Sequence, residues 1–124
     1  MNIPNNLQYT KDHEWINIYN DVATIGITDY AQSELGDIIF IEFPDIGLEC
    51  SAGETIGTIE AVKTVADLYS PLKGTIVDIN PNLEDRPDLV NKDPYMDGWI
   101  VKLDSDTEDL SSLLSANKYK KLMQ

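Results

Sequence analysis

Lys63 is the residue whose surroundings point most directly to chemistry. Apolar and polar residues alternate over 55–60, as in a half-buried strand, and a second extended pattern covers 65–70. Only residues 61–64 separate these patterns, which is about the length of a tight hairpin connection. The sequence therefore predicts that Lys63 lies at the tip of a hairpin, with its side-chain amine exposed.

The residue types in this turn favour a specific role for the lysine. The connection reads Ala-Val-Lys-Thr, without the Asn-Gly or Asp-Gly pair that usually makes a two-residue hairpin turn. The alternative is a solvated surface charge, which is what most surface lysines are. A weak repeat, Thr-Ile-x-x-Ile at 55–59 and again at 75–79, lies on either side of the turn.

The rest of the sequence predicts neither a catalytic site nor a metal site. His13 is the only histidine and Cys50 the only cysteine, and no nucleophile stands beside the histidine. An ordinary structural zinc site needs more ligands of these types. We therefore expect His13 to be a structural or surface residue, and Cys50 to be structural or merely tolerated.

The elements that must position Lys63 follow from similar patterns. A hairpin is predicted over 15–19 and 22–27 with Asn-Asp at its tip, and then a short helix over 29–35 that Thr28 caps and Gly36 ends. The next run is continuously apolar, which is typical of a buried strand, and we place that strand at 38–43.

The second half of the chain is predicted to add a long connection, a strand and a helix. Residues 81–98 are rich in Pro, Asn and Asp and hold at most a short helical piece around 83–89, and a strand follows over 99–103. A C-terminal helix is predicted over about 105–123, interrupted at 115–117 and packed on the sheet. Its start has the Ser-x-x-Glu spacing of a capping box, and its apolar stripe consists of Leu110, Leu113, Leu114, Tyr119, Leu122 and Met123.

The segment around Lys63 resembles the lipoyl/biotinyl attachment hairpin, in which a lysine at an exposed turn carries a swinging prosthetic arm. Glu60 lies three residues before Lys63, Gly47 sixteen before and Gly74 eleven after, as in the attachment pattern of that family. Biotin carriers usually have Met on both sides of the lysine, and the lipoyl domains of 2-oxoacid dehydrogenases usually have Asp before and Ala after. Neither pair is present here.

The flanking residues are most similar to those of the H protein of the glycine cleavage system. Val62 and Thr64 flank the lysine, and Asp-Leu-Tyr-Ser-Pro-Leu-Lys-Gly follows at 67–74. The blocks that extend this resemblance are 9–15, 26–32, 35–38, 89–95 and 98–99. It implies a mainly β fold, a lipoyl-type flattened β-barrel or barrel-sandwich hybrid of two sheets with short helices. We expect one domain over 1–124, with its hairpin core at about 38–103.

The resemblance also implies a non-catalytic carrier. A lipoate ligase or a lipoyl/octanoyl transferase would join lipoate to Lys63, at a turn that Glu60, Val62 and Thr64 present. A pyridoxal-phosphate glycine decarboxylase would load the aminomethyl group of glycine. A tetrahydrofolate-dependent aminomethyltransferase would then unload it, and an FAD-dependent dihydrolipoyl dehydrogenase would reoxidise the dithiol.

An aminomethyl group carried on sulfur is unstable in water, so the arm needs a sheltering cleft. By resemblance this role falls to Glu14 and Asp67, and also to Asp12, where relatives often have another residue. The alternative is that these acids are exposed charges on an acidic surface.

The same motif also fits a different function for the whole chain, that of an H-like relay that passes lipoate to other proteins. A dehydrogenase lipoyl domain is disfavoured because no Pro/Ala-rich linker is present.

Composition limits the partners and the compartment. The 124 residues carry 22 carboxylates and nine cations, a net charge of −13, which argues against nucleic acid or an anionic membrane as a partner. No apolar run approaches the roughly 20 residues of a membrane span. The lone cysteine suits a reducing compartment, and the N-terminus lacks the pattern of a signal or transit peptide. We expect a monomer in the bacterial cytoplasm, or in the mitochondrial matrix if the source is eukaryotic.

Overall fold

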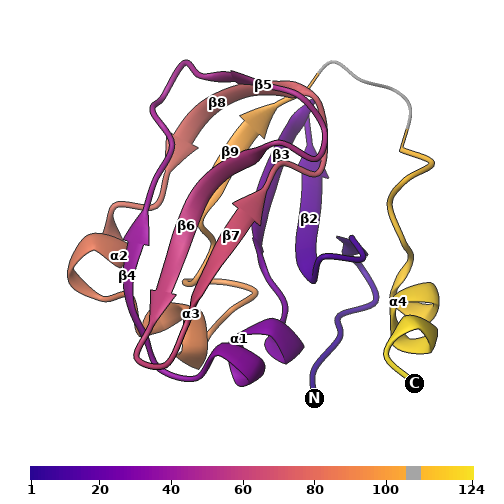
Figure 1. The fold of residues 1–124 in the computed structure, drawn as a ribbon. Coiled ribbons are helices and arrows are strands. Elements are labelled where there is room, and N and C mark those ends of the chain that lie inside the picture. The colour runs from indigo at the N-terminus through magenta and orange to yellow at the C-terminus, as the bar shows by residue number, and fades with distance from the viewer. Residues whose placement is uncertain (106–109) are drawn as a thin grey trace.

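The computed structural model describes residues 1–105 and 110–124, and these residues form two antiparallel sheets (Figure 1). The larger sheet has the strand order β1-β2-β3-β9-β8-β5, and the smaller sheet has the order β4-β6-β7. The strands are β1 (Gln8–Tyr9), β2 (Glu14–Tyr19), β3 (Val22–Ile27), β4 (Ile38–Glu42), β5 (Glu49–Cys50), β6 (Thr55–Ala61), β7 (Val65–Tyr69), β8 (Gly74–Ile79) and β9 (Val101–Asp104). The helices are α1 (Asp29–Leu35), α2 (Asn82–Asp85), α3 (Leu89–Lys92) and α4 (Ala116–Leu122).

Apolar side chains from both sheets meet in one core. Ile25 and Ile76 come from the larger sheet, Ile59 and Leu68 come from the smaller sheet, and each is at most 1% exposed. Removing such side chains from water is the main force that holds the two sheets together. The predicted strands on both sides of Lys63 are confirmed as β6 and β7.

The first predicted hairpin and the first helix are confirmed. Asn20 and Asp21 connect β2 to β3 with φ values of 49° and 66°, the left-handed region that these residue types tolerate in tight turns. The Thr28 hydroxyl accepts a hydrogen bond from the N–H of Ala31 and so caps α1. Gly36 ends that helix with a φ of 78°.

The strand β4 is less buried than predicted. Ile38 and Ile41 lie in the core, but Ile39 is 54% exposed and Phe40 is 52% exposed. The pairing of β4 with β6 contains an irregularity between Ile38 and Phe40, and β4 forms an edge of the smaller sheet. The continuous apolar run indicated burial on both faces, whereas the outer face of this strand is open to solvent.

The connection 81–98 contains two one-turn helices instead of one helical piece around 83–89. Between α2 and α3, Arg86 leaves the helical region with φ −129° and ψ 64°. Pro87 explains the break, because the residue before a proline is disfavoured in the helical region and proline has no N–H to donate. Leu83 and Val90 still bury their side chains in the core.

The C-terminal helix is much shorter than predicted. Helical structure begins at Ala116, and Ser115, expected to interrupt a helix, is its N-cap and accepts a hydrogen bond from the N–H of Lys118. Leu114 is extended and exchanges two backbone hydrogen bonds with Tyr9, at 2.7 and 2.8 Å. This pairing to β1 replaces the helical bonds that the apolar stripe had indicated. Glu108 of the predicted capping box lies outside the described residues.

The helix α4 packs through one buried tyrosine. The ring of Tyr119 stacks on Tyr9 with centroids 4.7 Å apart, and its hydroxyl bonds Thr28 Oγ1 at 2.7 Å and His13 Nδ1 at 2.8 Å. Leu122, predicted to pack on the sheet, is half exposed. Burial lowers the pKa of His13. Of the two roles predicted for this histidine, structural or surface, its hydrogen bond to Tyr119 supports the structural one.

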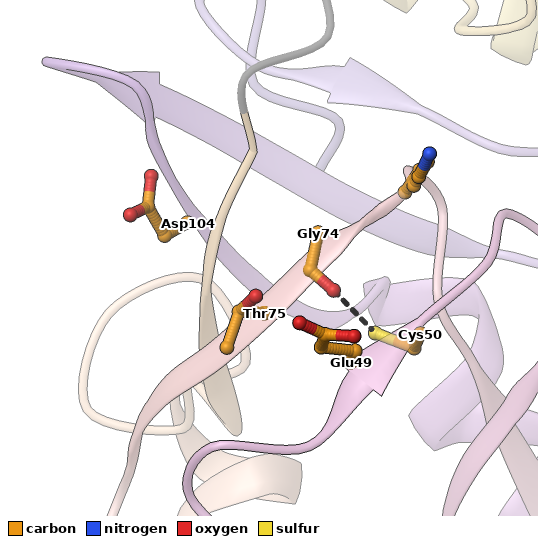
Figure 2. Close-up of a pocket in the computed structure, with 6 residues that line it drawn as sticks. Glu49, Cys50, Gly74, Thr75 and Asp104 are labelled. Atoms are coloured by element: carbon orange, nitrogen blue, oxygen red, sulfur yellow. Dashed lines mark hydrogen bonds between the residues drawn. The ribbon is translucent and has the colours of Figure 1, made fainter.

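Cys50 is a buried thiol at the pairing of β5 with β8. Its Sγ atom donates to the carbonyl oxygen of Gly74 at 3.4 Å (Figure 2). A Cβ atom on Gly74 would collide with the carbonyl oxygen of Asp104, so only glycine fits where β8 approaches β9. The thiol is buried and hydrogen-bonded, which supports the structural one of the two roles predicted for it.

Candidate functional site

The turn between β6 and β7 presents Lys63 to solvent, as the sequence predicted. The N–H of Ala61 donates to the carbonyl oxygen of Thr64 at 2.8 Å and closes the turn. Val62 and Lys63 form the tip, both are exposed, and Val62 is 67% exposed. A partner protein can therefore approach the lysine amine from outside the fold.

The turn rests on the connection between α1 and β4. The N–H of Val62 donates to the carbonyl oxygen of Asp37 at 3.0 Å. The Lys63 side chain passes close to Gly36, where an added Cβ atom would lie 3.3 Å from Lys63 Cε. Because Gly36 also has a φ of 78°, a side chain at this position would be strained and would crowd the lysine.

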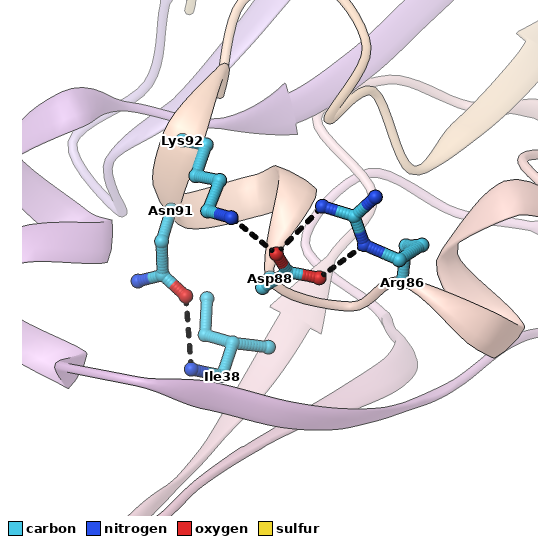
Figure 3. Close-up of polar contacts among 5 residues, drawn as sticks. All are labelled: Ile38, Arg86, Asp88, Asn91 and Lys92. Carbon is cyan, nitrogen blue, oxygen red and sulfur yellow. Dashed lines mark hydrogen bonds and ion pairs between the residues drawn. The ribbon is translucent and has the colours of Figure 1, made fainter.

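Asn91 on α3 fixes the backbone on which the turn rests. Its Nδ2 atom donates to the carbonyl oxygen of Gly36 at 2.8 Å and to Gln32 Oε1 at 3.0 Å. Its Oδ1 atom accepts a hydrogen bond from the N–H of Ile38 at 2.9 Å (Figure 3). The sequence prediction missed Asn91. The only indication was its place in a block that resembles the family, because its partners lie far away in the sequence.

The short helix α3 carries an exposed ion-pair cluster. Asp88 accepts two hydrogen bonds from the Arg86 guanidinium and pairs with Lys92 Nζ at 3.1 Å (Figure 3). These cations hold the pKa of Asp88 well below its usual range. Ion pairs that are open to solvent contribute little to stability. The hydrogen bonds of Asn91 therefore explain the position of α3 better than this ion-pair cluster does. They hold α3 against the connection between α1 and β4.

The acid Glu14, predicted to shelter the arm, is almost fully buried. The side chain is 2% exposed, and its two oxygens accept hydrogen bonds from the Thr10 hydroxyl at 3.1 Å and from the N–H of Tyr69 at 2.9 Å. Burial raises the pKa of Glu14 to about 7, although both hydrogen bonds favour the charged form. Glu14 therefore changes charge near neutral pH.

Glu14 and Asp12 share a cleft, whereas Asp67 lies outside it. The cleft has a volume of about 480 Å³. Asp67 is an exposed residue in the middle of β7, between the lysine turn and the end of the strand that Glu14 contacts. The residues that line the cleft are Thr10, Lys11, Asp12, Glu14, Ala52, Gly53, Ser70, Pro71, Ser112 and Leu114.

The hollow beside Cys50 is a separate feature. It has a volume of about 380 Å³, and Glu49 and Asp104 lie on it (Figure 2). None of the residues of the lysine turn lines it. Among the residues that the structure describes, no group of three or more metal-ligating side chains is present. The helices within the same residues are too short or too polar to cross a membrane.

Comparison with known proteins places this site in a family. The model of the glycine cleavage H-protein family matches residues 7–124. A glycine cleavage system H protein of Bacteroides fragilis is 53% identical over 121 residues, which cover 97% of this chain and 96% of that protein. One from Staphylococcus epidermidis is 50% identical over 124 residues, covering 99% and 98% of the two chains.

A solved structure is similar in fold over nearly the same length. The crystal structure of a glycine cleavage system H protein from Mycobacterium marinum superposes with a TM-score of 0.89 at 38% identity. The match covers 96% of this chain and 97% of the other. The predicted lipoyl-type flattened barrel of two sheets is confirmed by this likeness.

Glu14→Gln is expected to remove a pH-dependent loss of stability. Well below pH 4.5, the ordinary pKa of a glutamate side chain, the carboxyl group is protonated in both the folded and the unfolded chain. As the pH rises towards 7, the unfolded chain releases this proton first, which favours unfolding of the wild-type protein. The variant should gain stability relative to wild type across this range, by up to about 3 kcal/mol at about 1.4 kcal/mol per tenfold change in protonation.

Urea unfolding of both proteins at several pH values measures this difference. Glu54→Gln, at an exposed residue, is the matched control and should follow the wild-type curve. Parallel stability curves for Glu14→Gln and wild type would contradict the assignment of a raised pKa to Glu14.

Asn91→Ala is expected to loosen the lysine turn without unfolding the protein. The variant loses the bonds to Gly36 and Ile38, each contributing roughly 0.5–1.5 kcal/mol. Hydrogen exchange of the Val62 N–H should become about tenfold faster or more. Exchange in the β2–β3 hairpin should not change. Asn82→Ala, at an exposed position on α2, should leave the Val62 rate unaltered.

Proposed function

Because the chain belongs to the glycine cleavage H-protein family, we propose that Lys63 is the residue to which its lipoyl group is attached. This family supplies the lipoyl carrier of the glycine cleavage system, and its members work with the other components of that system. The observation that supports the assignment is that Lys63 is exposed at the tip of a closed hairpin, and that Val62 hydrogen-bonds this tip to the connection between α1 and β4.

The surroundings of Lys63 suit amide formation by an external enzyme. An attaching enzyme would supply the lipoate carboxyl group in an activated form. The Lys63 amine would lose a proton and form the amide bond to the carboxyl carbon, and the activating group would leave. The tip contributes access, since its neighbours leave the amine open, and Gly36 leaves room for the lysine stem. When bound, lipoate supplies a redox-active disulfide at the end of a flexible arm.

The chain itself is proposed to be a non-catalytic carrier in the bacterial cytoplasm. The relatives named above are bacterial proteins, and the buried Cys50 thiol is not paired in a disulfide. Its proposed partners are a pyridoxal-phosphate glycine decarboxylase, a tetrahydrofolate-dependent aminomethyltransferase and an FAD-dependent dihydrolipoyl dehydrogenase. A net charge of −13 suits brief contacts with several enzymes, because charge speeds encounter more than it strengthens binding.

The strand β7 gives the arm a route from the turn to the cleft. From Val65 to Tyr69 the chain advances about 13 Å, at roughly 3.3 Å per residue. The lysine stem and the lipoyl chain make about a dozen bonds and extend to roughly 15 Å, by the dimensions of an extended chain. Asp67 lies four residues from Lys63, about 13 Å at the same rise, so the end of the arm reaches the level of Asp67, on the side of the strand that leads to the cleft. There exposed Asp67, and Asp12 beyond it, can attract the cationic amine of the aminomethyl cargo.

Glu14 contributes to this shelter in a different way. Its oxygens are already bonded to Thr10 and Tyr69, so the carboxylate forms a fixed wall of the cleft. A carboxylate has further lone pairs and can accept another hydrogen bond from the cargo. This contribution is greatest above pH 7, where the negative form dominates.

Lys63→Arg tests the attachment site. The variant keeps the positive charge but has no amine that can form this amide, so it should fold normally and gain no lipoyl mass. Intact mass spectrometry before and after incubation with a lipoate ligase, lipoate and ATP measures the gain. The wild-type protein should gain one lipoyl group, and peptide mapping should locate it at Lys63.

Lys73→Arg is the matched control, because Lys73 is an exposed lysine at another turn. It should be modified as fully as wild type. Lipoylation of Lys63→Arg, or modification spread over several lysines of the wild-type protein, would refute the assignment.

Asp67→Asn is expected to shorten the lifetime of the loaded arm. Lipoylation, measured by mass, should be unchanged because the residue is four positions beyond the attachment lysine. Release of formaldehyde from the loaded variant should be several-fold faster, since the charge that holds the amine is lost. Asp45→Asn, at an exposed position between β4 and β5, should release formaldehyde at the wild-type rate. Equal rates for both variants would rule out the role of Asp67.

A further inference from the structure

The outer face of the smaller sheet exposes apolar side chains beside the lysine turn. Phe40, Glu60 and Val65 are register partners across β4, β6 and β7, so their side chains stand in one row on the same face. Phe40 is 52% exposed and Val65 is 60% exposed. Val62 at the tip is more exposed still, so an apolar surface continues from the sheet to the turn.

A hollow lies next to this row, at the edge of β4. Its volume is about 400 Å³, and Phe40 and Phe43 form an apolar wall together with Leu83 from α2. Glu42 and Glu84 also line it. None of its lining residues is basic. The chemistry that fits this hollow is an apolar side chain with a lysine or arginine beside it.

The acidic character continues across the sheet. Glu42, Thr58 and Asp67 form the row next to the apolar one, and both of these acids are exposed. A partner that covers this face would therefore present apolar groups to Phe40 and Val65 and positive charge to the acids beside them. Such a combination of apolar anchors and complementary charges is typical of transient protein interfaces.

The position of this face selects one kind of partner. An enzyme that forms an amide at Lys63 must bring its active site to the Nζ atom, so it must cover the turn and the surface beside it (Figure 1). Enzymes that act on the sulfur atoms meet them at the far end of the arm. They can work without covering the base of the arm.

We propose that this face, made of the row Phe40, Glu60 and Val65 and the hollow beside Phe40, is the docking surface for the enzyme that attaches lipoate to Lys63. The proposal rests on the proposed function of Lys63. It adds a partner surface that lies outside the turn itself and assigns a role to apolar residues that the fold leaves exposed. Phe40 belongs to both the row and the hollow, so it is the expected anchor.

Phe40→Ser tests the docking surface. The rate constant kcat/KM for attachment by an ATP-dependent lipoate ligase should fall by at least about tenfold, as for the loss of an aromatic anchor at an interface. Tyr19→Ser is the matched control, since Tyr19 is a 77% exposed aromatic residue on β2 of the larger sheet, and it should react at the wild-type rate. Thermal unfolding of both variants confirms that they are folded.

A second measurement separates attachment from the later reactions. After prolonged incubation has lipoylated Phe40→Ser completely, dihydrolipoyl dehydrogenase run in its reverse direction, with NADH as the two-electron donor, should reduce the disulfide of its arm at the wild-type rate. An equal loss in attachment and in reduction would overturn the assignment to the attaching enzyme. Equal attachment rates for Phe40→Ser and Tyr19→Ser would overturn it as well.

A binding measurement keeps this test independent of the proposed function. Lys63→Arg cannot be acylated, so its affinity for the ligase reports docking alone. Adding Phe40→Ser to this variant should raise the Kd by at least about tenfold. If the wild-type protein gained no lipoyl mass, the proposed function would fail, but the two affinities would still decide the docking surface. Equal affinities would overturn it.

Discussion

The hydrogen bond from the N–H of Val62 to the carbonyl oxygen of Asp37 joins the lysine turn to the rest of the protein. A hairpin tip would otherwise be free to bend on its two strands. Here the tip is bonded to the connection between α1 and β4, and Asn91 bonds that connection on both sides of Asp37. The result is an exposed lysine on a fixed base. A flexible arm on such a base searches a defined volume, which favours repeated encounters with the same cleft.

The sequence predicted those structural features that depend on residues close together in the chain. The strands around Lys63 follow from alternation, and Thr28 and Gly36 mark the two ends of α1 because capping is a local interaction. The Asn-Asp turn is predictable for the same reason. The exposed lysine followed from the short gap between two strand patterns, whereas its chemistry came only from the resemblance to a family.

Features that depend on distant partners could not be predicted. Asn91 bonds a residue 53 positions away, and Glu14 bonds one 55 positions away. For Glu14 the sequence left two roles open, a sheltering cleft or an exposed charge, and it did not indicate that the carboxyl group is almost fully buried. Leu114 shows the same limit, because its pairing with Tyr9 overrides an apolar pattern that favours a helix. The continuous apolar run of β4 indicated burial on both faces of the strand, but one face is open to solvent. The sequence alone does not show which face of a strand other elements cover.

The hydrogen bond between Glu14 and Tyr69 also affects how copies of the protein can contact one another. The strand β7 is an edge of the smaller sheet, and an open edge invites pairing with a strand of another molecule. The Tyr69 N–H is already taken by the Glu14 carboxylate, and Asp67 places a charge on the same strand. An incoming strand would have to displace a buried acid from its partner. The edge can thus stay open to a mobile arm while edge-to-edge aggregation is disfavoured.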